Sequence, residues 1–208
     1  MRAPDAAHIV RLNPTTRLSV PLHEQHRVTM SYYDVDAILT DGEKVPCTFE
    51  LEVPYLGHLN NAPSQVLKPG TPLTLPLWLA ELLALASSGD SSPPLTLNIP
   101  PCLGTAVLSA LKADPRAVPL RDQSVHLYGV GVRMLDLFDE KELSEVLRRT
   151  WTVRAGDVGL HARKADEGGL GGQQEEFLRG LEEWERKLFR RAHEGIKGAK
   201  EWTERVKK

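Results

Sequence analysis

The distribution of proline constrains this chain more than any other feature of its sequence. All 15 prolines lie at or before Pro119, and residues 120–208 contain none. Proline removes a backbone donor and breaks helices, so the first half of the chain is expected to form strands, turns and short helices. The second half is free to form long helices. The sequence therefore predicts two parts of different architecture, with the proline-rich part first.

Residues 30–70 are expected to form a small β-rich domain. A single helical turn is predicted through Ile38 and Leu39, with Asp34 or Asp36 as its N-cap. A strand follows, because apolar and polar residues then alternate with the period of a half-buried strand. Its apolar positions are Val45, Cys47, Phe49, Leu51 and Val53.

Two prolines, Pro46 and Pro54, bracket this strand. Because proline cannot donate to a neighbouring strand, they favour a position at the edge of a sheet. One or two further short strands are expected within residues 66–78. A unit this small buries little core by itself, so it is expected to lean on another element.

Residues 71–208 are expected to form an α-helical domain of about five helices. The predicted helices cover residues 75–86, 102–114 and 120–138, a stretch that starts after Asp139, and residues from about 173 to 206. Asp139 and Glu142 have the spacing of a capping box. The predicted fold is thus mainly α, a helical bundle preceded by a small β-rich domain.

The last predicted helix has apolar residues at a spacing close to a heptad repeat. They are Phe177, Leu181, Trp184, Leu188, Ala192, Gly195, Ala199, Trp202 and Val206. Gly180, Gly195 and Gly198 weaken such a helix by roughly 1 kcal/mol each relative to alanine. They are tolerable where another backbone comes close or a partner supports the helix.

Helices 75–86 and 120–138 are apolar on more than one face. The apolar run from Leu73 to Ala86 is shorter than the about 20 residues needed to cross a bilayer, and it contains Pro76 and Glu81. The N-terminus lacks the long apolar core of a secretory signal. Apolar surface beyond what one core requires is typical of a subunit interface.

The first 29 residues differ from the rest of the chain. They contain four arginines, three of the seven histidines and two acidic residues, and no helix or strand period persists in them. We expect a disordered N-terminal extension. An organelle transit peptide is an alternative, because the segment is Arg-rich and acid-poor. A third possibility is that translation starts at Met30.

Overall charge and cysteine use exclude some classes of function. The formal net charge is −2, so no global basic field draws the chain to DNA or to anionic lipid. Cys47 and Cys102 lie far apart and belong to no Cys-x-x-Cys pair, so we expect reduced, apolar cysteines in an intracellular location.

No catalytic, cofactor-binding or metal-binding residues are predicted. The sequence has no Walker loop, no His-Glu-x-x-His and no Gly-x-Ser-x-Gly. The pair Gly129 and Gly131 lacks the third glycine of a dinucleotide fingerprint, so close helix packing explains it better. Two alternatives to an interaction protein stay open: a DNA-binding module that uses the basic stretch 184–200, and an enzyme with an unrecognised site.

Several ordered segments of the sequence resemble the Psf three (partner of Sld five) family of GINS complex subunits, in its fungal form. They are MSYYDVDAILTDGEKVPCTFELEVPYLG at 30–57, LPLWLA at 75–80, YGVG at 128–131 and LFRRAHEGIKGAKEW at 188–202. The likeness extends from Met30 to the end of the chain. Residues 1–29 have no counterpart in the family pattern.

This resemblance implies a non-catalytic structural subunit. It implies a nuclear heterotetramer of four related subunits, in which this one lies closest to the second Psf subunit. It further implies that the tetramer joins the MCM ring and a Cdc partner as the replicative DNA helicase, in initiation and elongation. Apolar helix faces would then bury against sister subunits. The residues expected as interface or core anchors are Trp78, Leu79, Leu82, Tyr128, Met134, Trp184 and Phe189.

Overall fold

The computed structural model describes residues 33–60, 66–86, 93–166 and 172–207. These residues form two compact units. Unit 1 takes the described residues up to Pro100 together with Asp136–Phe138, and unit 2 takes Pro101–Leu135 and the residues from Asp139 onward. The predictions for residues 1–29, which include the alternative start at Met30, lie outside the described residues.

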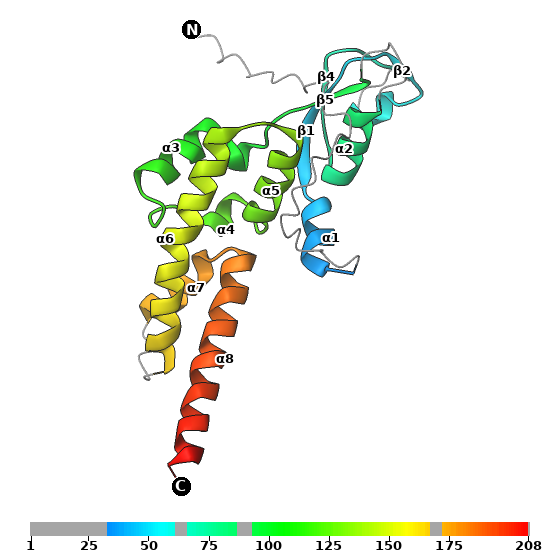
Figure 1. The fold of residues 1–208 in the computed structure, drawn as a ribbon. Coiled ribbons are helices and arrows are strands. Elements are labelled where there is room, and N and C mark those ends of the chain that lie inside the picture. The colour runs from blue at the N-terminus through cyan, green and yellow to red at the C-terminus, as the bar shows by residue number, and fades with distance from the viewer. Residues whose placement is uncertain (1–32, 61–65, 87–92, 167–171, 208) are drawn as a thin grey trace, which may run out of the picture. The chain divides into compact units, whose positions relative to one another are not determined.

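Unit 1 is built on a three-stranded antiparallel sheet with the strand order β4-β1-β5. A second, two-stranded sheet pairs β2 with β3. The elements in chain order are α1 (Val35–Asp41), β1 (Lys44–Phe49), β2 (Val53–Pro54), the 3-10 helix η1 (Gly57–Asn60), β3 (Val66–Leu67), β4 (Thr71–Pro76), α2 (Leu77–Leu85) and β5 (Leu95–Leu97). Figure 1 shows them from blue to green.

The domain boundary expected between residues 70 and 71 falls inside unit 1. Strand β4 begins at Thr71 and pairs with β1 along its whole length, from Thr71 opposite Phe49 to Pro76 opposite Lys44. Helix α2 then follows directly and contacts β5. Backbone pairing of residues 71–76 and the contacts of α2 with the sheet therefore join this segment to the β-rich part of the chain.

Strand β1 is the central strand of its sheet, so its predicted edge position is wrong. Pro46 is tolerated there because pairing with β5 starts only at Cys47, and because the Pro46 carbonyl accepts a hydrogen bond from the Asn98 N–H. The predicted alternation holds through Phe49, with Val45, Cys47 and Phe49 buried. It ends there, since Leu51 is exposed and β2 is a separate strand.

Helix α1 begins as the sequence predicts, whereas α2 begins at Leu77, two residues after the expected start at residue 75. Asp34 caps α1, because its carboxylate accepts a hydrogen bond from the Asp36 N–H at 3.0 Å. Pro76 is the N-cap residue of α2, where its missing N–H removes no helical hydrogen bond. Leu77, Ala80 and Ala84 form the buried face of α2.

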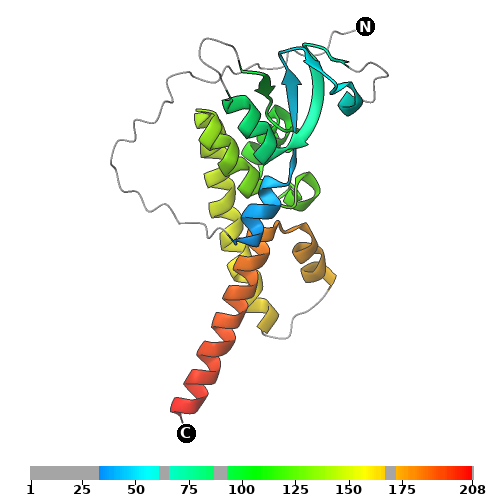
Figure 2. The same cartoon turned by 90° about the vertical axis from the view of Figure 1, so that its right-hand side faces the viewer.

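The elements that the structure describes in unit 2 are all helices, joined by short segments without regular structure. These elements are η2 (Pro101–Leu103), α3 (Thr105–Ala113), α4 (Leu120–Gln123), α5 (Leu127–Leu137), α6 (Lys141–Asp166), α7 (Gly172–Gly180) and α8 (Glu183–Val206). The later part of α6 lies beside the first part of α8, and the end of α8 extends beyond α6 (Figures 1 and 2). The predicted fold class, mainly α with a preceding β-rich part, is confirmed.

Two of the predicted helices are each broken in two. The helix expected over 120–138 is interrupted at residues 124–126, where the Ser124 hydroxyl accepts a hydrogen bond from the His126 N–H. The helix expected from 173 is interrupted at Leu181 and Glu182.

None of the helices in the described residues has the length and apolar content that crossing a bilayer requires.

The predicted capping box of Asp139 and Glu142 is also wrong. Helix α6 begins at Lys141, and its first backbone hydrogen bond runs from the Ser144 N–H to the Glu140 carbonyl. Asp139 therefore lies one residue before the cap position. The Glu142 carboxylate instead forms an ion pair with Lys112 of α3.

Gly131 of α5 lies at a close contact with α6. A Cβ atom at this position would come within 2.5 Å of a terminal methyl carbon of Leu147, which is itself buried. Gly156, in the middle of α6, has no neighbouring atom within 4 Å of the same position. The missing side chain at Gly131 thus leaves room for the Leu147 side chain of α6.

Alanine substitutions at these two glycines should therefore have opposite effects on stability. Alanine favours a helix over glycine by roughly 1 kcal/mol, so Gly156→Ala should raise the free energy of unfolding by up to that amount. Gly131→Ala gains the same helix propensity, but its new methyl group overpacks a buried contact, which typically costs 1–3 kcal/mol. We therefore expect its free energy of unfolding to fall by about 1 kcal/mol. Urea denaturation of both variants measures the difference. Equal stabilisation by the two would contradict the packing found here.

Candidate interaction surfaces and the charge network of unit 2

A buried ion pair joins α6 to α8 in unit 2. The Arg154 guanidinium donates to both oxygens of the Glu185 carboxylate, from Nε to Oε1 at 2.6 Å and from Nη2 to Oε2 at 2.9 Å. The Glu185 side chain is 0% exposed and that of Arg154 is 9% exposed. The Tyr128 hydroxyl of α5 donates to the same carboxylate at 3.1 Å. Three helices therefore meet at one buried anion.

Arg154 also holds the segment before α4. Its Nη1 donates to the carbonyl oxygens of Pro115 and Val118, each at 3.1 Å. Burial disfavours its charged form, but the hydrogen bond and the charge of Glu185 outweigh burial and raise the pKa of Arg154. The guanidinium is thus kept charged and donates four hydrogen bonds, which offset the cost of burying it.

Glu182 is a second buried carboxylate, at the junction of α7 and α8. Its Oε2 accepts from the Trp184 N–H at 2.7 Å, and Glu185 accepts from the Glu182 N–H at 3.2 Å. The two residues form a capping box at the start of α8. Sequence reasoning missed this cap because Leu181 and Trp184 keep the helical apolar spacing across the junction. The three-residue spacing of Glu182 and Glu185, which is that of a capping box, could have indicated this cap.

Burial changes the titration of this cluster. It raises the pKa of Glu182 to about 8; the hydrogen bond from Trp184 lowers this pKa in part, and the nearby charge of Glu185 raises it. The pKa of Tyr128 also lies above its usual range, chiefly through burial and through the charge of Glu185. Both groups are therefore largely protonated at neutral pH.

Aromatic rings pack around the network. Tyr128 and Trp151 meet edge to face at 5.1 Å between ring centroids, and Tyr128 stacks with Trp184 at 6.1 Å. Trp151 and Trp184 also meet edge to face, at 6.2 Å. The indoles limit water access to the ion pair, which strengthens it electrostatically.

A cleft of about 630 Å³ opens beside this network, between the segment 116–119, α6 and α7. Two of its charged groups pair with each other, Arg116 with Asp157 at 2.6 Å. His161 stacks on Phe177 at 3.8 Å, and burial together with the charge of Lys164 lowers the pKa of His161. Among the described residues, no group of three or more His, Cys, Asp or Glu side chains is placed to hold a metal.

Exposed apolar stripes are the main surface feature of unit 1. On α1 the exposed residues Val35, Ile38 and Leu39 have the spacing of one helix face. On α2 the exposed residues Trp78, Leu82 and Leu85 also have the spacing of one helix face. We call these residues together the α1–α2 surface.

A further exposed stripe lies on the last three turns of α8. Trp202 is 64% exposed, and Val206 and Ala199 on the same side are exposed as well. A Cβ atom added to Gly195 or Gly198 would meet no atom within 4 Å. We call the exposed residues 195, 199, 202 and 206 the α8 stripe.

The structure separates the seven expected anchors into three groups. Tyr128 and Met134 are buried, so they belong to the core. Trp78 and Leu82 are exposed and lie on the α1–α2 surface. Leu79, Trp184 and Phe189 are half-buried. The apolar pattern alone could not make this separation, because it does not show which faces neighbouring helices cover.

Two family models match the chain, and each falls on one of the two units. The model described as PSF3 N-terminal domain matches residues 33–85. The model described as GINS complex protein helical bundle domain matches residues 102–204.

Curated fungal relatives agree with these matches. The chain is 79% identical over 179 residues to a protein of Gibberella zeae named DNA replication complex GINS protein PSF3, covering 86% of this chain and 99% of the relative. Proteins with the same name are 49% identical in Neurospora crassa, with 86% and 100% covered, and 35% identical in Saccharomyces cerevisiae, with 83% and 98% covered. This chain therefore belongs to the PSF3 family of GINS complex proteins, and the resemblance found in the sequence is confirmed.

Removal of the buried cation should destabilise the helical unit strongly. In Arg154→Met, Glu185 keeps its desolvation cost but loses its countercharge, so we expect a loss of about 3–5 kcal/mol in the free energy of unfolding. Arg116→Met is the matched control, because its ion pair with Asp157 is largely solvent-exposed. Urea denaturation followed by circular dichroism measures both. Comparable losses in the two variants would contradict a special role for Arg154.

Glu182 should make stability fall as pH rises. Its folded pKa of about 8 lies above its reference value of 4.5, so between these values the folded state binds a proton that the unfolded state does not. Stability then decreases across this window, by at most about 1.4 kcal/mol per pH unit for one proton. In Glu182→Gln the decrease should be smaller, whereas the exposed control Glu194→Gln should behave like the parent. Denaturation at pH 5.5 and pH 8 tests this, and identical slopes in all three proteins would refute it.

Proposed function

We propose that this chain is a non-catalytic structural subunit of the heterotetrameric GINS complex and acts in the nucleus in DNA replication. The family matches and the names of the relatives support this role. The buried polar groups of unit 2 fit it as well, because the Arg154–Glu185 ion pair joins α6 to α8 and Glu182 caps the start of α8. Their effect is to fix helices, as a scaffold requires.

The observation that carries the proposal is the α8 stripe. A helix end with exposed Trp202 and Val206 has apolar surface that its own unit leaves uncovered. Aromatic residues in such positions are typical centres of protein interfaces. We infer that sister subunits of the complex cover this stripe, the second Psf subunit being the nearest.

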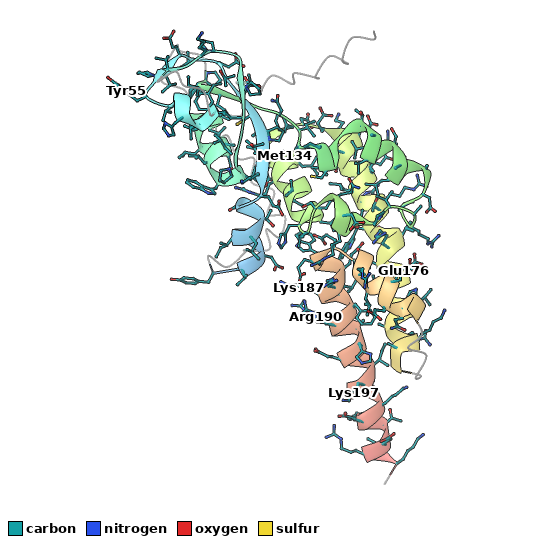
Figure 3. The ribbon with its side chains drawn as sticks, turned by 180° about the vertical axis from the view of Figure 1, so that it is seen from behind. Tyr55, Met134, Glu176, Lys187, Arg190 and Lys197 are labelled. Carbon is teal, nitrogen blue, oxygen red and sulfur yellow. The ribbon has the colours of Figure 1, made fainter. Side chains whose placement is uncertain are left out.

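The expected anchors then take different roles. Trp78 and Leu82 are proposed as contacts with other proteins, with Leu79 beside them. Tyr128 and Met134 support the core of unit 2, and Met134 lies in α5 (Figure 3). Trp184 and Phe189 are proposed to hold α8 in place from their half-buried positions on its first turns.

We further propose that the tetramer joins the MCM ring and a Cdc partner as the replicative helicase. The chain would supply no chemistry of its own to strand separation. Its contribution is stiffness, because the Arg154–Glu185 pair and the Glu182 cap fix the start of α8. A stiff helix can transmit the position of one partner to another during initiation and elongation.

A DNA-binding role for α8 is the second candidate. Residues 187–207 contain seven basic and three acidic residues, and Lys187, Arg190 and Lys197 project from the helix (Figure 3). Phosphate contacts by such residues would make binding strongly salt-dependent. The apolar stripe on the same helix favours a protein partner.

A charge placed on the α8 stripe should block assembly. We expect Trp202→Glu, co-expressed with the other three GINS subunits, to lose the one-to-one-to-one-to-one complex that the parent chain forms. Lys197→Glu makes a larger charge change on the polar side of the same helix and should leave the complex intact. Size-exclusion chromatography with light scattering measures the masses.

Assembly of Trp202→Glu as efficiently as the parent would refute the role of the stripe. A parent chain that remains a stable monomer in the presence of its partners would refute the proposed function. Loss of salt-dependent DNA binding in Lys197→Glu, with assembly unchanged, would support the second candidate.

A further inference from the structure

We propose that the α1–α2 surface binds a basic amphipathic helix of a partner protein. This inference deepens the proposed function, since it assumes that unit 1 works within an assembly, and it names the chemistry of the segment that unit 1 receives. It rests on the exposed apolar residues of two adjoining helices and on the charge of the chain around them.

The two helices of this surface meet at one joint. The Leu77 N–H at the start of α2 donates to the Glu43 carbonyl, two residues after the end of α1, at 2.9 Å. Strand β1 begins at Lys44, opposite Pro76, so the sheet fixes the same joint from the other side. The surface is therefore held by backbone contacts, and a partner would meet a preformed site.

The exposed residues of both helices are large and apolar. Leu82 is 60% exposed and Trp78 is 53% exposed, and on α1 Val35, Ile38 and Leu39 are each more than half exposed. The buried face of α2 consists of Leu77, Ala80 and Ala84, so its exposed face is not the one that builds the core. Six exposed apolar side chains on two helices that contact each other exceed the single exposed leucines that a protein surface ordinarily carries.

Charge indicates which partner fits. Residues 33–86 contain seven acidic residues and two lysines, whereas the chain as a whole carries a formal charge of only −2. Asp34, Asp36 and Asp41 flank the exposed residues of α1, and Glu81 lies within α2. Such a field attracts basic protein segments and repels DNA phosphates and anionic lipid headgroups.

A helix suits this surface better than an extended peptide. The exposed residues repeat every three or four positions on both α1 and α2, which is the spacing that ridges of a third helix fit. Helix α2 has nine residues and is about 13 Å long, so an occupant of three to four turns would span it. Lysine or arginine at the margins of its apolar face would be attracted by the net negative charge of residues 33–86.

The test uses the full chain alone and in the assembled GINS complex. The probe is an 18-residue fluorescent peptide of leucine and lysine with one apolar helix face. Two control peptides have the same leucines with glutamate in place of lysine, and the same composition in scrambled order. We expect the basic amphipathic peptide to bind at least tenfold more tightly than either control, by fluorescence anisotropy.

Matched variants locate the binding. Leu82→Gln and Ile38→Gln should each weaken binding several-fold. Leu160→Gln changes a leucine of similar exposure, 56%, on α6 of unit 2 and should have no effect. Circular dichroism checks that the exposed substitutions leave the fold intact.

The outcomes separate this inference from the proposed function. Binding to the chain alone but not to the complex supports the inference and makes a sister subunit the occupant. Binding to both supports it and makes the occupant a protein outside the tetramer. Equal binding of all three peptides, or no effect of Leu82→Gln and Ile38→Gln, overturns the inference even when the tetramer assembles. Failure of the tetramer to form bears on the proposed function alone.

Discussion

The helical unit depends on how it buries the Glu185 carboxylate. This anion has no contact with solvent, and its cost is offset by Arg154 from α6, by the Tyr128 hydroxyl from α5 and by the backbone N–H of Glu182. Each donor comes from a different part of unit 2, so the carboxylate can be satisfied only when all of these parts are in place. An apolar contact at this point would tolerate sliding of one helix along another, whereas directed hydrogen bonds do not.

The proposed role as a structural subunit requires a core that holds each helix in one position. The α8 stripe and the α1–α2 surface are useful to a partner only if their directions are fixed. In unit 2 the fixing element is the capped start of α8, which sits against α6 through Arg154. In unit 1 it is the pairing of β1 with β4, which sets where α1 ends and α2 begins. A fixed helix direction thus depends on side-chain charges in unit 2 and on backbone pairing in unit 1.

The sequence predicted the fold class and most elements, because proline placement and apolar period are local signals. The Asp34 cap and the buried alternation of Val45, Cys47 and Phe49 followed from them. The breaks at 124–126 and at Leu181–Glu182 did not, since the apolar residues stay in helical phase across both. The edge position of β1 was wrong because Pro46 lies just before the ladder with β5. Burial of Glu182 and Glu185 was missed because charged pairs usually face solvent, and exposure of Trp78 and Leu82 depends on which neighbours cover them.

Gly195 and Gly198 give the free end of α8 a further property. Each costs the helix roughly 1 kcal/mol relative to alanine, and no neighbouring atom lies close enough to compensate. Before assembly this end consequently opens more easily than the capped start of α8, and a protease can reach it. Where partners cover it, the same peptide bonds are shielded. The turnover of the chain in the cell would then follow the supply of its partners, so that surplus copies are cleared and subunit amounts stay matched.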